Sequence, residues 1–201
     1  MKLYSMPSSG NSYKARLLLA LQGRAYERVD VEYDSEALAQ AHLSGALPFG
    51  KAPALHLDDG RVLAESNAIL CYLGQGSDFT PTGSFAQAQM LSWMFWEQNQ
   101  HEGVIAVRAA LLNYEHRKPE ATPQRLEELL TRGYALLQVM EDALKAQTWL
   151  VGEAITLADI CLYGYTHTAD TRGGYDLSPY PALCAWRDRI AALPGYVGLD
   201  G

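Results

Sequence analysis

What this sequence has little of already excludes several classes of protein. Its only cysteines are Cys71, Cys161 and Cys184, and they lie far apart. An odd, dispersed set argues against a disulfide framework or a zinc site and is typical of a reducing compartment. We therefore expect a cytoplasmic protein without a metal. There is also no run of Lys or Arg, and the net charge is -7, so binding to nucleic acid or to an anionic membrane is not expected.

Long apolar stretches are missing as well. No apolar run is long enough to span a bilayer. The first residues indicate a short strand and not a signal peptide, because no apolar segment follows a basic start. With 48% hydrophobic and 19% charged residues, the composition is that of an ordinary soluble globular protein, with one large domain or two small ones.

The first part of the chain alternates between predicted strands and helices. Strands are predicted at residues 3–6, 26–33, 54–57 and 61–64, and helices at 12–22, 34–44 and 66–73. Alternating strands and helices imply one sheet with helices packed on it, and their order matches the thioredoxin-like arrangement. We predict an α/β thioredoxin-like domain over residues 1–76.

The remainder of the chain has a different character. Residues 77–84 lie in a stretch rich in Gly, Ser, Thr and Pro, which predicts a linker. No convincing strand follows, and helices are predicted at 85–115, 123–147, 157–168 and 181–193. The spacing of Thr156 and Asp159 is typical of a capping box, which gives Asp159 a structural role. We predict an all-α domain over residues 85–201.

Pro53 stands directly before a strand that has the pattern of a buried one. Proline removes a ladder donor and belongs at the first residue of a strand, often with a special backbone geometry such as a cis Ala52–Pro53 bond. The N–H and C=O of Ala52 would then pair with the backbone of a peptide-like ligand, as an added strand does. Lys51 would reach a carboxylate of that ligand by charge; the alternative is a solvated surface lysine.

Glu65 and Ser66 stand where the second strand of a hairpin meets the start of a helix. Backbone N–H groups and the positive end of the helix dipole attract a carboxylate at such a place. Ser66 adds a hydroxyl donor, and Glu65 can accept a hydrogen bond from an ammonium group. The pair would therefore bind the head group of an amino acid. The alternative is that Ser66 only caps its own helix.

Three motifs in this order make the chain resemble the cytosolic glutathione transferases over nearly its whole length. They are residues 9–16 (SGNSYKAR), residues 48–55 (PFGKAPAL) followed by 65–69 (ESNAI), and residues 150–159 (LVGEAITLAD). The resemblance is greatest to bacterial members similar to the zeta and nu classes. It implies glutathione as a co-substrate, a homodimer, and a helical domain that forms the pocket for the acceptor substrate.

The resemblance also places the chemistry at the loop that contains Ser9. A free thiol has a pKa of about 8.5, and a hydroxyl or amide donor aimed at the sulfur favours the thiolate. In a zeta-like alignment Ser9 falls on the catalytic serine. In a nu-like alignment Ser9 falls on a threonine position and Asn11 on an asparagine that contacts glutathione. The alternative is that both are only turn and N-cap residues.

The loop contains no cysteine, so a mixed disulfide between the enzyme and glutathione is not expected. For the acceptor substrate, Trp96, Gln100 and Val104 repeat every four residues and would share one helix face, which would suit a small apolar electrophile. Three functions remain open. They are glutathione transfer to an electrophile, glutathione-dependent isomerisation or disulfide-bond reduction, and non-catalytic glutathione binding or interaction.

Overall fold

The computed structural model describes all 201 residues, which form two compact units. The first unit consists of Met1–Ser77 together with Ala191–Gly201, and the second consists of Asp78–Ile190. The sequence prediction assigned residues 191–201 to the helical domain. The structure instead packs them on the first unit, because side chains of that unit bind their carbonyl groups.

The first unit is built on a sheet of four strands in the order β2-β1-β3-β4. Strand β1 (Lys2–Ser5) pairs in parallel with β2 (Glu27–Asp30) and antiparallel with β3 (Ala54–His56). Strand β3 pairs antiparallel with β4 (Val62–Ala64). The predicted strands are all present, although three of them are shorter than predicted, β2 most of all.

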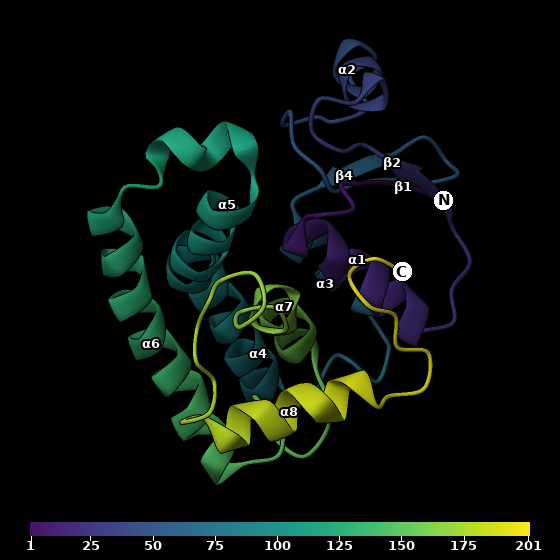
Figure 1. Ribbon diagram of the computed structural model, residues 1–201. Helices are drawn as coiled ribbons and strands as arrows, with labels where there is room; N and C mark the ends of the chain where they lie inside the picture. Colours follow the sequence, from purple (N-terminus) through teal and green to yellow (C-terminus); the bar gives the residue numbers. More distant parts are fainter. The chain divides into compact units, whose positions relative to one another are not determined.

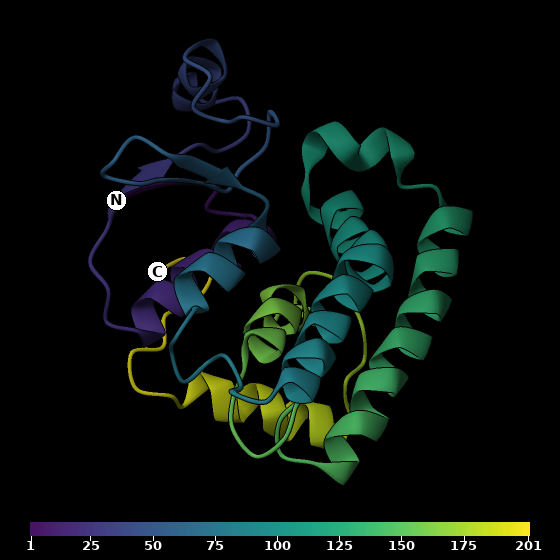
Figure 2. The ribbon, with the colours of Figure 1, turned by 180° about the vertical axis from the view of Figure 1, so that it is seen from behind.

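Helices cover both faces of this sheet. Helices α1 (Gly10–Leu21) and α3 (Ser66–Gly74) lie on one face, and α2 (Glu36–Leu43) lies beyond the other (Figures 1 and 2). Apolar side chains of α1 and α3 are fully buried, and a second buried cluster joins α2 to the strands; it consists of Val31, Ala41, Ala46, Leu47 and Ala54. The predicted thioredoxin-like α/β domain is confirmed.

The second unit contains helices only. Helix α4 (Ser84–Trp96) continues through a π-helix, η1 (Glu97–Ala106), into α5 (Val107–Asn113). Figure 2 shows this stretch of the chain running on without a break. The remaining elements are the 3₁₀-helix η2 (Glu115–Glu120), α6 (Pro123–Ala146), α7 (Leu157–Thr166) and α8 (Pro181–Ala191). The all-α prediction is confirmed, but the helix predicted at 85–115 is not a uniform α-helix.

Helix α7 is the buried helix of the second unit, and Asp159 organises its start. Oδ2 of Asp159 accepts from the N–H of Thr156 at 2.8 Å and completes a capping box. Oδ1 accepts from the N–H of Leu150 at 3.0 Å and from the indole N–H of Trp186 at 2.9 Å. The predicted structural role of Asp159 is confirmed. None of the helices has the length and apolar character that crossing a membrane requires.

Candidate ligand-binding site

The candidate site of the first unit is assembled where α1 and α3 begin. Ser9 is the N-cap of α1, and Ser66 is the first residue of α3. Asn11 lies in the first turn of α1, and its Oδ1 accepts a hydrogen bond from Ser66 Oγ at 3.1 Å. The structure therefore joins two predicted site residues that are 55 positions apart. The positive ends of two helix dipoles are brought to one place.

Ser9 has a capping role that is compatible with a second role. Its Oγ accepts from the N–H of Ser12 at 3.4 Å, and its own N–H donates to Met6 O at 3.1 Å. A hydroxyl that accepts a hydrogen bond keeps its hydrogen for another acceptor. The N-cap interpretation of Ser9 is thus found in the structure, and it leaves the hydroxyl able to donate to a ligand.

The orientation of Asn11 is fixed by two donors. Besides Ser66, Lys14 Nζ donates to Asn11 Oδ1 at 2.8 Å. Because both donors face the amide oxygen, the NH₂ group of Asn11 lies on the opposite branch of the amide. That NH₂ group is the part of Asn11 that can donate to a sulfur or to another acceptor.

Glu65 has an unusual backbone. Its φ of 70° is in the left-handed region, which few non-glycine residues adopt, and its exposed side chain makes no capping hydrogen bond. Such a conformation costs about 1–3 kcal/mol and is concentrated at functional sites. The N-cap of α3 is Glu65, and the Ser66 hydroxyl is directed to Asn11. The alternative that Ser66 only caps its own helix is therefore not supported.

The second part of the candidate site is the short segment of residues 51–53, directly before β3. The Ala52–Pro53 bond is cis, as predicted. Pro53 is buried, Ala52 is half-buried and lies just outside the first paired residue of β3, and Lys51 is exposed. His42, also exposed, lies beside this loop, since its Cε1 would be 4.0 Å from a Cβ built on Gly50. His42 was not assigned by the sequence analysis.

The three residues predicted to line the acceptor pocket of the second unit differ in burial. Residues 97–106 are π-helical, with i→i+5 hydrogen bonds, so the helix predicted to carry these residues is not a uniform α-helix. Trp96 is half-buried and Gln100 is exposed. Val104 is 1% exposed and packs with Leu111 and Leu129 in the core. The structure therefore places Val104 in the core, and the pocket-lining role of the three residues stays a prediction.

Trp96 instead belongs to a groove within the second unit. The groove has a volume of ≈ 280 Å³, and it is lined by Gln89, Ser92, Trp93, Trp96 and Val139. The rings of Trp93 and Trp96 are perpendicular, with centroids 5.4 Å apart. Trp96 is thus the predicted acceptor-pocket residue that lines this groove.

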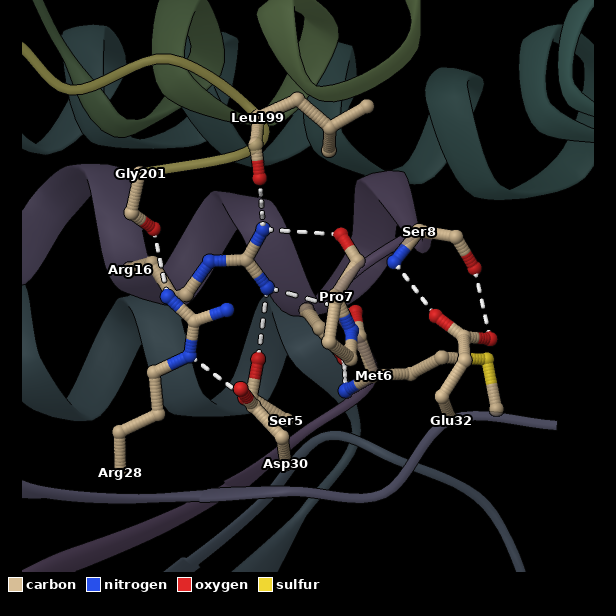
Figure 3. Close-up of polar contacts among 11 residues, drawn as sticks. Ser5, Met6, Pro7, Ser8, Arg16, Arg28, Asp30, Glu32, Leu199 and Gly201 are labelled. Atoms are coloured by element: carbon tan, nitrogen blue, oxygen red, sulfur yellow. Dashed lines mark hydrogen bonds and ion pairs between the residues drawn. The ribbon is translucent and has the colours of Figure 1, made fainter. Parts of the chain in front are cut away.

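Sequence reasoning missed the residues behind the Ser9 loop. Glu32 accepts from the N–H of Ser8 at 2.9 Å and from its hydroxyl at 2.8 Å. Arg16 is 1% exposed and donates to the carbonyl oxygens of Met6 and Pro7 (Figure 3). The available signal was a charged residue inside the otherwise apolar run of residues 15–21.

The structure contains no arrangement of side chains for metal binding and no disulfide. No cluster of three or more His, Cys, Asp or Glu residues is placed to hold a metal ion. No disulfide joins Cys71, Cys161 or Cys184. Burial raises the pKa of the Cys71 thiol, which makes that residue a poorer nucleophile.

Comparison with known proteins adds two family matches. The family model "Glutathione S-transferase, N-terminal domain" matches residues 1–75. The model "Glutathione S-transferase, C-terminal domain" matches residues 104–194. Together they cover the sheet-containing part of the first unit and most of the helices of the second.

Individual relatives agree with these matches. The crystal structure of a glutathione S-transferase from Pseudomonas fluorescens is 43% identical, with a TM-score of 0.91 and coverage of 98% of each chain. The disulfide-bond oxidoreductase YfcG of Escherichia coli is 28% identical over 96% of this chain and 90% of its own. The maleylacetoacetate isomerase of Pseudomonas aeruginosa is 28% identical over 98% of this chain and 93% of its own.

Proposed function

Because the chain belongs to the glutathione S-transferase family, we propose that it binds glutathione and activates the thiol for attack on a small, largely apolar electrophile. The observation that carries the proposal is the hydrogen bond between Asn11 and Ser66. It brings the start of α3, suited to an amino-acid head group, together with the start of α1, suited to a thiolate. The relatives of similar length are named as a glutathione S-transferase, a disulfide-bond oxidoreductase and a maleylacetoacetate isomerase.

In this proposal the γ-glutamyl end of glutathione lies at the start of α3. The N–H groups there and the Ser66 hydroxyl bind the α-carboxylate, and the exposed carboxylate of Glu65 accepts from the α-ammonium. The main chain of Ala52 pairs with the backbone of the cysteinyl residue. Lys51, which is exposed, attracts the glycine carboxylate by charge.

The sulfur then lies against the Ser9 loop. The Ser9 hydroxyl or the Asn11 amide donates to the sulfur, and the positive end of α1 favours the negative charge. Each pKa unit by which the thiol is acidified requires about 1.4 kcal/mol of differential stabilisation, within reach of one or two charge-assisted hydrogen bonds. The thiolate attacks the electrophilic carbon, forming a C–S bond, while a leaving group departs or a proton comes from solvent.

Glutathione binding and thiol acidity test this proposal together. Isothermal calorimetry should show binding, and a titration of thiolate absorbance in the complex should give a thiol pKa below that of free glutathione. Ser9→Ala or Asn11→Ala should raise the thiol pKa by about one unit, according to which residue donates. Ser35→Ala is the matched control, because Ser35 caps α2 in the same way, accepting from Leu38 N at 3.1 Å. It should lower stability by about 1 kcal/mol and leave the titration unchanged.

A chain that shows no calorimetric binding of glutathione would overturn the proposal. Binding with an unshifted thiol would instead favour the non-catalytic alternative. Binding with an acidified thiol that neither Ser9→Ala nor Asn11→Ala changes would move the donor role to another group of the loop.

The names of two relatives favour a second candidate, glutathione-dependent isomerisation or disulfide-bond reduction. Parallel assays with an aryl halide, a mixed disulfide of glutathione and a maleyl compound separate these reactions from transfer. Turnover of only the second or third compound would replace the transferase proposal. We further propose that the protein is a cytoplasmic homodimer. Light scattering on the purified protein tests the oligomeric state.

A further inference from the structure

The guanidinium of Arg16 is buried behind the Ser9 loop and binds four oxygen atoms. Nη1 donates to Ser5 Oγ at 2.6 Å and to Met6 O at 3.3 Å. Nη2 donates to Pro7 O at 3.1 Å and to Leu199 O at 2.6 Å. Figure 3 shows these contacts radiating from one side chain. All four acceptors are uncharged, so Arg16 is a buried cation that is stabilised by hydrogen bonds to carbonyls and a hydroxyl.

Two of these acceptors belong to the segment that leads into Ser9. Met6 O also accepts from the N–H of Ser9 at 3.1 Å. The carbonyl that positions the Ser9 backbone is thus itself held by Arg16. On the other side of the loop, Glu32 holds Ser8 through two hydrogen bonds (Figure 3). The position of the Ser9 hydroxyl therefore depends on side chains that do not reach the proposed ligand.

The fourth acceptor belongs to the C-terminal segment, residues 195–201. This segment is fitted closely to α1: Gly195 has a φ of +83°, and a Cβ there would be 2.8 Å from Ala20 O. The Tyr13 hydroxyl donates to Val197 O at 2.7 Å. Leu199 O then completes the set of oxygens around Arg16. Only glycine tolerates this crossing without a shift, which fixes where the segment meets the helix.

The charge of Arg16 makes each oxygen important. Burial lowers the pKa of the Arg16 guanidinium, and the nearby Arg28 lowers it further. A guanidinium nevertheless stays protonated in proteins, so the buried charge must be satisfied by the acceptors present. Without Leu199 O, the Nη2 group would keep only Pro7 O among its protein acceptors. The loop would then have to shift or admit water.

We propose that Arg16 is a positioning residue for the thiol-activating loop and that the C-terminal segment completes its coordination. The segment thereby controls how the Ser9 loop approaches the glutathione sulfur. This inference rests on the proposed function, since it concerns the same thiol. It adds residues 195–201 to the machinery, although none of them is placed in contact with the ligand.

Thiolate absorbance titrations of the glutathione complex test this role. Arg16→Gln removes the cation, and a chain that ends after Tyr196 removes Val197 and Leu199 while keeping Arg16. Each should raise the pKa of the bound thiol by about one unit, a roughly tenfold loss of thiolate at neutral pH. Arg16→Lys should restore part of the shift, because an ammonium keeps the charge but lacks the planar fork.

Arg24→Gln is the control for loss of one positive charge. Arg24 is an exposed residue of the same unit that donates to Leu73 O at 3.3 Å and makes no contact with the loop. It should leave the bound thiol's titration unchanged. A purely structural role for Arg16 would lower the melting temperature of its variants and leave the thiol pKa where the wild type has it.

The outcomes separate this inference from the proposed function. A wild-type chain that does not bind glutathione overturns the proposed function. A wild-type chain that acidifies the thiol, with Arg16→Gln and the truncated chain acidifying it equally well, overturns only the role of Arg16. If circular dichroism shows that Arg16→Gln does not fold, the truncated chain and Arg16→Lys decide by the same titration, because both keep the buried cation.

Discussion

The two units of this protein differ in how their functional residues are held. In the first unit, the candidate site residues lie at helix starts and beside a strand end, and polar contacts fix them individually: Asn11 by Lys14 and Ser66, and Ser8 by Glu32. In the second unit, a buried set of polar contacts around Asp159 serves the start of α7. In the proposed function, the polar contacts of the first unit support ligand binding, whereas those around Asp159 support folding.

Because of this difference, removing similar hydrogen bonds from the two units should have different effects on the protein. A substitution at the start of α3 should change ligand affinity while the fold persists. A substitution at the start of α7 should remove stability and leave the intrinsic chemistry of the first unit alone. Lost ligand affinity and lost stability must be measured separately to tell the two units apart. Each variant below is therefore followed by both unfolding and glutathione binding.

Asp159→Ala should give the largest effect on stability. It removes acceptors from the N–H groups of Leu150 and Thr156 and from the indole of Trp186, all of them buried. Several unsatisfied donors together should cost about 3–5 kcal/mol. Urea unfolding measures the loss. Asp170→Ala is the control, because Asp170 forms a partly exposed pair with Arg187 at 3.0 Å and should cost about 1 kcal/mol or less. Equal losses in both variants would contradict the structural role of Asp159.

Ser66→Ala should weaken glutathione binding more than it weakens the fold. In the proposed complex the hydroxyl donates to a carboxylate, and hydrogen bonds to charged groups contribute about 1.5–3 kcal/mol. Calorimetry should therefore show a dissociation constant raised roughly 10- to 100-fold. Ser77→Ala, which removes a hydroxyl that bonds Gly74 O at 2.7 Å near the end of α3, is the control and should not change affinity. An unchanged affinity in Ser66→Ala would separate Ser66 from the ligand.

Local signals predicted the first unit well. Pro53 before a strand, Glu65 and Ser66 before an apolar helix and the turn formers around Ser9 each act through neighbouring backbone, which the sequence displays directly. The sequence did not show that Arg16 would be covered by residues 195–201, because that contact joins positions 183 apart. In the second unit, the order of helices was predictable. The burial of Val104 was not, because it depends on packing against side chains such as Leu129 of α6, which the local pattern does not display.

Val104→Ala and Gln100→Ala test the predicted acceptor face. Val104 is 1% exposed among apolar neighbours, so truncating it should cost about 1–2 kcal/mol through lost packing. Gln100 is exposed, so its truncation should change stability by less than about 0.5 kcal/mol. Chemical unfolding measures both, and acceptor kinetics are followed in parallel. Equal losses of acceptor affinity in the two variants would support a shared pocket-lining face, and unchanged affinity in both would contradict it.

His167→Gln should change the pH dependence of stability by a smaller amount. Burial is the main cause that lowers the His167 pKa from 6.5 to about 4, and the nearby Arg187 and Arg172 lower it further. Between these values the unfolded chain binds a proton that the folded chain does not. The neutral imidazole's contribution is therefore fully present above pH 6.5 and is lost as the pH falls toward 4.

The contribution of His167 can be isolated by comparing two unfolding curves. Each pH unit in this window corresponds to about 1.4 kcal/mol, so the wild type should lose about 2 kcal/mol more than His167→Gln between pH 7.5 and 4.5. Glutamine keeps an amide donor for Tyr163 O, which lies 2.7 Å from Nδ1, and it does not titrate. Unfolding free energies at the two pH values supply the difference. Parallel losses in both proteins would mean that the histidine is protonated in the fold, and its burial would then not govern the acid sensitivity of the second unit.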